Sequence, residues 1–102
     1  MDPKILENPE IMKLICQDEV FDPIKNYFKS AFDVVIDHEM GRKNPKTIED
    51  AKKAEQDLSK MVEETLNPAL AVYNLPKLST DRECLHKSAC DIVFYLFEHR
   101  AR

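Results

Sequence analysis

The sequence contains a single glycine, Gly41, among its 102 residues. Phosphate-binding loops and dinucleotide-binding turns need several glycines at fixed spacing, so the sequence excludes both kinds of site. Long apolar runs are also missing. The longest, Ile92 to Phe97, has six residues, whereas a helix that spans a membrane needs about 20. No apolar stretch typical of a signal peptide follows Met1, so we expect a cytoplasmic protein without a membrane segment.

Positive charge is not in excess either. The 15 Lys and Arg residues are outnumbered by 19 Asp and Glu residues, which gives a net charge of -4. An acidic chain gains little from releasing counterions on DNA or RNA, so nucleic acid is not the expected partner. The three cysteines are an odd number and lie in apolar patterns. We therefore expect reduced, buried thiols, as in a reducing compartment.

The composition that remains is typical of a globular domain, with 43% hydrophobic and 33% charged residues. The length suits one domain that spans residues 1–102. Asp or Asn precedes five of the six prolines. Asp and Asn cap helix starts, and proline in the first turn has no hydrogen bond to lose, so each pair is a candidate helix start. These pairs are Asp2-Pro3, Asn8-Pro9, Asp22-Pro23, Asn44-Pro45 and Asn67-Pro68.

Apolar spacing after these pairs predicts a short turn over 3–6 and helices over 9–18, 23–40 and 45–66. The third of these helices begins either at Asn44-Pro45 or at Thr47, which has Asp50 three residues on in a weaker form of the capping box. Gly41 supplies the left-handed residue that ends the second helix. Pro68 is expected to break or kink the third, with Asn67 capping a short continuation over 69–74. Thr80 and Glu83 form a capping box that opens the last helix, 80–102.

The predicted fold is therefore all-α: a compact four-helix bundle with a short extra helical segment after Pro68. Short connections favour antiparallel neighbours. We expect the helices over 23–40 and 80–102 to be the most buried, and the helix over 45–66, which alternates charge along its outer face, to be the most exposed.

The last helix has more apolar surface than one core-facing stripe requires. Phe97 widens the stripe, while Phe94 points about 180° away from Leu85 at 100° per residue. Such a helix needs cover on more than one side, either from its own chain (the helix over 9–18, or Asn67–Leu75) or from a partner. The stripe itself consists of Leu85, Ala89, Ile92, Val93 and Leu96.

Candidate chemistry is sparse. Cys84, His86 and Cys90 form a Cys-x-His-x3-Cys pattern, but Cys84 points about 160° away from His86 on a helix, so buried thiols are the better interpretation than a metal site. Glu83-x-x-His86 matches half of a di-iron motif, and no second copy exists. We expect no catalytic residue, no metal and no cofactor.

These observations favour a non-enzymatic protein-interaction or regulatory module. The last helix is expected to dock another protein or to pair with itself in a homodimer, with Phe94 as the anchor. The alternative is a small nucleic-acid-binding or RNA-processing domain that uses Arg82, His86 and the basic end His99, Arg100 and Arg102. The predicted partner-binding residues are Lys87, Cys90, Asp91, Phe94, Tyr95 and Glu98.

Overall fold

The computed structural model describes residues 1–100 of the chain and consists of helices joined by short connections. The all-α prediction is confirmed. The described helices follow in the order α1 (Pro3–Glu7), α2 (Pro9–Ile15), α3 (Asp18–Glu39), α4 (Pro45–Met61), the π-helical turn η1 (Val62–Leu66), α5 (Asn67–Val72) and α6 (Arg82–Arg100).

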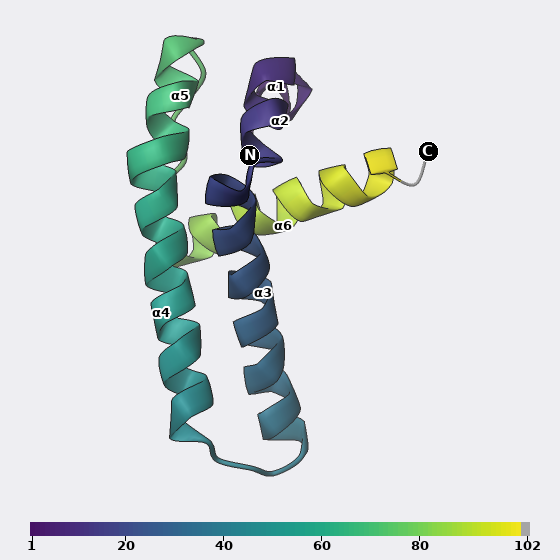
Figure 1. Ribbon diagram of the computed structural model, residues 1–102, viewed down its shortest axis with the longest axis vertical. Coiled ribbons are helices and arrows are strands. Elements are labelled where there is room, and N and C mark those ends of the chain that lie inside the picture. The colour runs from purple at the N-terminus through teal and green to yellow at the C-terminus, as the bar shows by residue number, and fades with distance from the viewer. Residues whose placement is uncertain (101–102) are drawn as a thin grey trace.

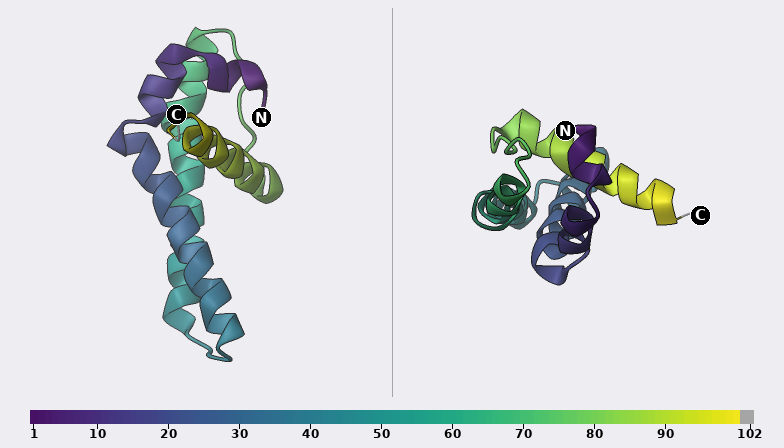
Figure 2. Two further views of the ribbon diagram at one scale, coloured as in Figure 1. Left: turned by 90° about the vertical axis from the view of Figure 1, so that its right-hand side faces the viewer. Right: turned by 90° about the horizontal axis from the view of Figure 1, so that it is seen from above.

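Helices α3 and α4 form an antiparallel pair, which we call the hairpin (Figure 1). Helix α5 continues the column of α4, and α6 crosses one face of the hairpin near the end where α1 and α2 also lie (Figure 2). The amino group of Met1 lies 3.0 Å from Oδ2 of Asp91 and so links the start of the chain to α6. The four main predicted helices and the short segment after Pro68 are all present. No helix in the described range has the length and apolar character needed to cross a membrane.

Three of the five predicted Asx-Pro helix starts are confirmed. The Oδ1 atom of Asp2 accepts the Lys4 N–H at 2.9 Å, and Asn8 accepts the N–H groups of Glu10 and Ile11 in the same way. Asn44 caps α4 with one such bond of 3.1 Å, to the Lys46 N–H. These carboxylate and amide oxygens satisfy N–H groups that have no partner within the helix.

The prediction for Asp22-Pro23 is wrong, because α3 begins at Asp18 and holds Pro23 inside the helix. The predicted first helix correspondingly ends earlier, at Ile15. A proline inside a helix costs one backbone hydrogen bond. The early start carries Val20 into the core on the same helix as Ile24, and both are essentially buried. Burial of Val20 offsets the lost bond.

Of the break or kink predicted at Pro68, the break does not occur, because the chain stays helical from η1 into α5. The backbone instead widens into η1, and the Asn67 N–H donates to the carbonyl of Val62, five residues earlier. A wider turn relieves the clash between the proline ring and the carbonyl of Glu64 that an α-helix would impose. Asn67 is helical, and its side chain caps nothing. It holds the backbone of Leu78, with Nδ2 donating to the Leu78 carbonyl at 3.0 Å and Oδ1 accepting the Leu78 N–H at 2.7 Å.

The predicted end of the helix over 23–40 and the predicted start of the last helix have different outcomes. Gly41 has φ +66°, which confirms the predicted left-handed end of α3. The predicted capping box of Thr80 and Glu83 is wrong, because α6 begins at Arg82 and Thr80 therefore does not stand at the cap position. The Thr80 hydroxyl donates to Oε1 of Glu63 at 3.0 Å. Helix α6 starts at Arg82, and the Leu85 N–H donates to the carbonyl of Asp81. The predicted end at Arg102 lies outside the described residues.

The core occupies only one end of the molecule. Between Ile24 and Ala54 the described chain has no buried residue. The expectation that the helix over 23–40 is among the most buried is therefore wrong for its second half, because α6 covers only the first half of α3 (Figure 2). The core is formed by Ile5, Ile11, Ile15, Val20, Ile24, Leu58, Met61, Val62, Leu66, Leu70, Leu78, Leu85, Ala89, Ile92 and Leu96.

Candidate interaction surface

Helix α6 buries one stripe and exposes the rest of its apolar surface. Leu85, Ala89, Ile92 and Leu96 are buried as predicted. Val93 lies at the edge of the stripe and is partly exposed. Phe97, predicted to widen the stripe, is 73% exposed. It belongs to the last turns of α6, and that end of the helix extends beyond the hairpin (Figure 1).

Phe94 is 66% exposed. It borders a shallow hollow whose other wall is formed by the N-terminal residues Met1, Pro3 and Leu6. The neighbouring segment of the same chain is therefore α1, which leaves two thirds of Phe94 open. Helix α6 therefore has an exposed face around Phe94, which we call the α6 surface. It comprises Lys87, Asp91, Phe94, Tyr95, Phe97 and Glu98.

The six residues predicted to bind a partner do not all lie on this surface. Asp91, Phe94, Tyr95 and Glu98 line the same hollow. Asp91 is held by the Met1 amino group, and the ring of Tyr95 lies tilted at 45° to the ring of His99, with centroids 3.9 Å apart. Lys87 is exposed. Cys90 points elsewhere, with its sulfur 3.6 Å from Nε2 of His86.

His86 joins α6 to α3. Its Nδ1 atom lies 2.7 Å from the hydroxyl of Tyr27, and its Nε2 atom faces Cys90. The rings of Tyr27 and His86 meet edge to face, and Phe28 lies beside them. In the sequence Tyr27 lies on the apolar stripe of the helix over 23–40, which by itself indicates only a core position. Its pairing with a histidine 59 residues away depends on tertiary structure.

Such a cysteine–histidine–tyrosine arrangement resembles the geometry of an activated nucleophile, in which a base near the thiol is oriented by a third group. The electrostatics oppose that role. Burial raises the pKa of the Cys90 thiol, and the Asp91 carboxylate raises it further. Burial, followed by the charge of Glu55, likewise raises the pKa of Tyr27. Because nucleophilic cysteines need a lowered pKa, we interpret the cluster as a structural contact between α3 and α6.

The raised pKa has a measurable consequence. Cys90 should react with iodoacetamide at least several-fold more slowly than Cys16 and Cys84 at neutral pH, because less of it is thiolate and it is half-buried. The difference should narrow as the pH rises toward the pKa of Cys90. Mass spectrometry of peptides from timed samples measures the three rates. In urea the three reaction rates should converge. If Cys90 reacts fastest in the folded protein, this prediction is wrong.

The expectation of buried thiols is wrong for Cys16 and Cys84, which are both exposed. Cys16 lies at the end of α2, beyond the buried Ile15. Within residues 1–100, no group of three or more His, Cys, Asp and Glu side chains is placed to hold a metal ion. The structure therefore brings His86 and Cys90 together and leaves Cys84 apart.

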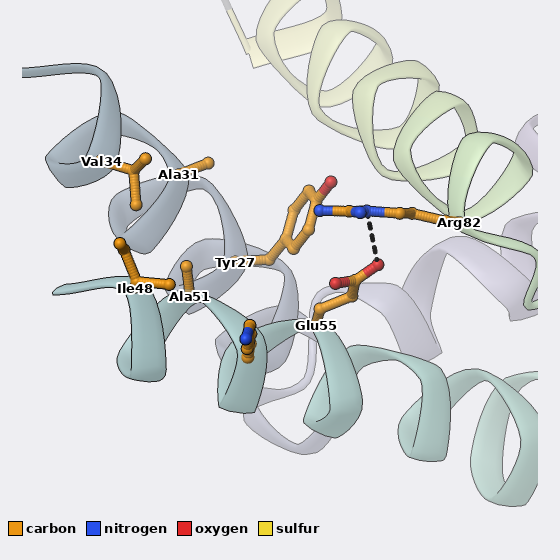
Figure 3. Close-up of a pocket in the computed structure, with 8 residues that line it drawn as sticks. Tyr27, Ala31, Val34, Ile48, Ala51, Glu55 and Arg82 are labelled. Atoms are coloured by element: carbon orange, nitrogen blue, oxygen red, sulfur yellow. Dashed lines mark ion pairs between the residues drawn. The ribbon is translucent and has the colours of Figure 1, made fainter. Parts of the chain in front are cut away.

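Arg82 and Glu55 close one end of a groove between α3 and α4, at the right in Figure 3. Arg82 Nε lies 3.2 Å from Oε1 of Glu55, and the ring of Tyr27 lies beside them. The small residues Ala31 and Ala51 line the groove. Its volume, about 260 Å³, falls just below the range of about 300–1,000 Å³ typical of small-molecule sites. We interpret it as a surface groove.

Further large apolar side chains are exposed on α3 and α4 and were not predicted. Phe32 is 64% exposed, and Val35, Ile36 and Met40 of α3 and Ile48 of α4 are also exposed. The sequence contains a signal for the exposure of Phe32. Tyr27 and Phe32 point about 140° apart on a helix, an arc too wide for one neighbouring helix to cover.

No protein-family model, curated protein or solved structure matches this chain. The class of protein is therefore defined by the structure alone: a small all-α protein with exposed apolar side chains on α6 and on the hairpin.

Proposed function

We propose that the protein is a non-enzymatic interaction module and that the α6 surface is its contact site, either for another protein or for a second copy. The exposure of Phe94 carries this proposal. Together with Phe97 it presents two phenylalanine rings to solvent, one helical turn apart. An exposed apolar patch of this kind often marks a site where another protein binds.

The surroundings of Phe94 support the proposal. Protein interfaces place aromatic side chains at the centre and polar residues at the rim. Around Phe94, the side chains of Lys87 and Glu98 are exposed, and Asp91 is already paired with the Met1 amino group. Phe94 can therefore be covered by a partner without burying an unpaired charge, which would cost several kcal/mol.

The nucleic-acid alternative receives less support. Arg82, which would contact phosphate, is paired with Glu55, so a phosphate would have to compete with that carboxylate. His86, which would act as acid or base, is hydrogen-bonded to Tyr27. The net charge of -4 also opposes binding to a polyanion. These contacts favour the protein-interaction module.

Phe94→Asp tests the proposal directly. Loss of a central aromatic anchor typically costs more than about 2 kcal/mol of binding free energy, so partner capture should fall by about tenfold or more. Stability should hardly change, because Phe94 is mostly exposed. Affinity capture and light scattering over a concentration series measure the two modes of binding. Replacing Phe94 with a photo-crosslinking phenylalanine analogue would covalently mark the protein that contacts it.

Phe32→Asp is the matched control, because Phe32 is equally exposed and lies on α3, outside the α6 surface. It should leave crosslinking at position 94 unchanged. If Phe94→Asp retains both the captured protein and the concentration dependence of the mass, the α6 surface is not an interface.

A further inference from the structure

We infer that the groove between α3 and α4 is a second docking site, which binds an acidic amphipathic helix of a partner protein. The inference does not rest on the α6 surface, because the groove lies on the hairpin and is lined by other residues. Helix α6 crosses the hairpin near one end (Figure 2). The groove begins there, at Arg82, and runs along the part of the hairpin that α6 does not cover (Figure 3).

The groove is long enough for a docked helix. The hollow that begins at Arg82 adjoins a second hollow nearer the loop between α3 and α4, because both are lined by Val34 and Ile48. Together they follow α3 from Tyr27 to His38, and we call them the hairpin groove. A rise of about 1.5 Å per residue makes this stretch of α3 roughly 16 Å long, which matches about three turns of a second helix.

The floor of the hairpin groove is apolar. Ala31, Val34 and Ala51 are half-buried where the two helices meet, and Ile48 is 50% exposed. The two alanine side chains are too short to fill the space between the helices, so a leucine or phenylalanine of a partner can enter it. Amphipathic helices dock in grooves through such anchors, spaced by three or four residues.

The rim of the hairpin groove is basic, although the whole chain has a net charge of -4. Asp37 pairs with Arg42 at 3.7 Å, and Glu55 pairs with Arg82 at 3.2 Å. Two further cations line the rim and pair with no carboxylate of the described residues: Lys43 and Lys52. Carboxylates of a partner can therefore meet these lysines without displacing an existing ion pair.

The floor and the rim together indicate the chemistry of the occupant. An acidic amphipathic helix supplies an apolar stripe for the floor and flanking carboxylates for the two lysines. The phosphates of a nucleic acid would gain nothing from covering Val34 and Ile48. A second copy of this chain is also disfavoured, because two molecules that each carry a net charge of -4 repel each other.

Two synthetic peptides test the inference. The first is a labelled helical peptide of about four turns with leucines along one stripe and glutamates beside them, and the second has lysine in place of each glutamate. Fluorescence anisotropy measures their affinities for the full chain. The net charge of -4 alone favours the lysine peptide. The hairpin groove instead predicts that the glutamate peptide binds at least about threefold more tightly at low salt. This preference should shrink as salt is added, because the rim is exposed.

Substitutions locate the binding site. Ile48→Asp puts a charge in the floor and should weaken binding of the glutamate peptide by about tenfold or more. Val35→Asp is its matched control, because Val35 is 55% exposed on α3 and lines neither hollow. Lys52→Glu should abolish the preference for the glutamate peptide. Lys53→Glu, which makes the same change in charge on the outer face of α4, should preserve it.

Amide chemical shifts of the wild-type chain give a readout that needs no variant. On addition of the glutamate peptide they should move at Val34 and Ile48 and stay constant around Phe94. A glutamate peptide that does not bind, or that binds no more tightly than the lysine peptide, would overturn the inference. Shifts confined to α6, or binding that Phe94→Asp abolishes and Ile48→Asp does not, would overturn it as well and would assign the peptide to the α6 surface.

Discussion

Leu66→Ala is expected to lower the free energy of unfolding by about 2–5 kcal/mol, because it removes a fully buried side chain and leaves a cavity. Leu66 is 0% exposed and ends the π-helical turn η1, where the wide backbone path meets the core. Domains of this size have a total stability of about 5–15 kcal/mol. The substitution therefore removes a large share of the stability, and urea denaturation followed by circular dichroism measures it.

Val72→Ala is the matched control for this prediction. Val72 lies six residues further on and is 75% exposed, so its truncation should change the stability by less than about 0.5 kcal/mol. If Leu66→Ala lowers the free energy of unfolding by less than about 1 kcal/mol, the packing described for η1 is wrong. Such a small effect requires a loosely packed core that can collapse into the cavity.

Asn67→Ala is expected to cost about 2–3 kcal/mol of unfolding free energy. It removes both hydrogen bonds to the Leu78 backbone, each worth about 0.5–1.5 kcal/mol net, and it leaves a donor and an acceptor without partners. Leu78 is buried, so water replaces these bonds poorly. The loss should appear as a lower urea midpoint with an unchanged slope.

Proteolysis adds a local readout to the same variant. Lys77 is exposed in the link that precedes α6, directly before the anchored Leu78. Trypsin should cut after Lys77 faster in Asn67→Ala than in the wild type, because the link opens locally before the rest of the chain unfolds. Gln56→Ala, which truncates an exposed amide on α4, should change neither measurement. Equal cleavage of Asn67→Ala and the wild type would mean that Asn67 does not hold the link.

Asn67 shows why its role could not be predicted from the local sequence. Asn67-Pro68 reads like the other Asx-Pro pairs, and Asn44-Pro45 does start a helix. At Asn67 the chain arrives already helical from α4, so the amide has no free helix end to cap. It binds Leu78 instead, a partner 11 residues away that only the folded chain brings near.

The candidate sites, too, could be predicted only in part from the sequence. Phe94 could be identified as surplus because its direction follows from helical geometry and the core stripe is visible in the sequence. For Phe32 the same geometry gives only part of the answer: the arc from Tyr27 to Phe32 is too wide for one neighbouring helix to cover, but the point where α6 stops covering α3 depends on distant residues. The contact between Tyr27 and His86 was missed for a related reason: neither residue carries a local signal for the other.

The sequence by itself determined the helical class, the caps at Asp2, Asn8 and Asn44, the left-handed end at Gly41 and the buried stripe of α6. All of these depend on neighbours within a few residues, where propensity, capping and periodicity act. Only the tertiary structure decided that α3 starts at Asp18, that η1 absorbs Pro68 and that half of the hairpin stays uncovered. These outcomes depend on which distant segments share one core, because burial between them can outweigh a local preference of about 1 kcal/mol.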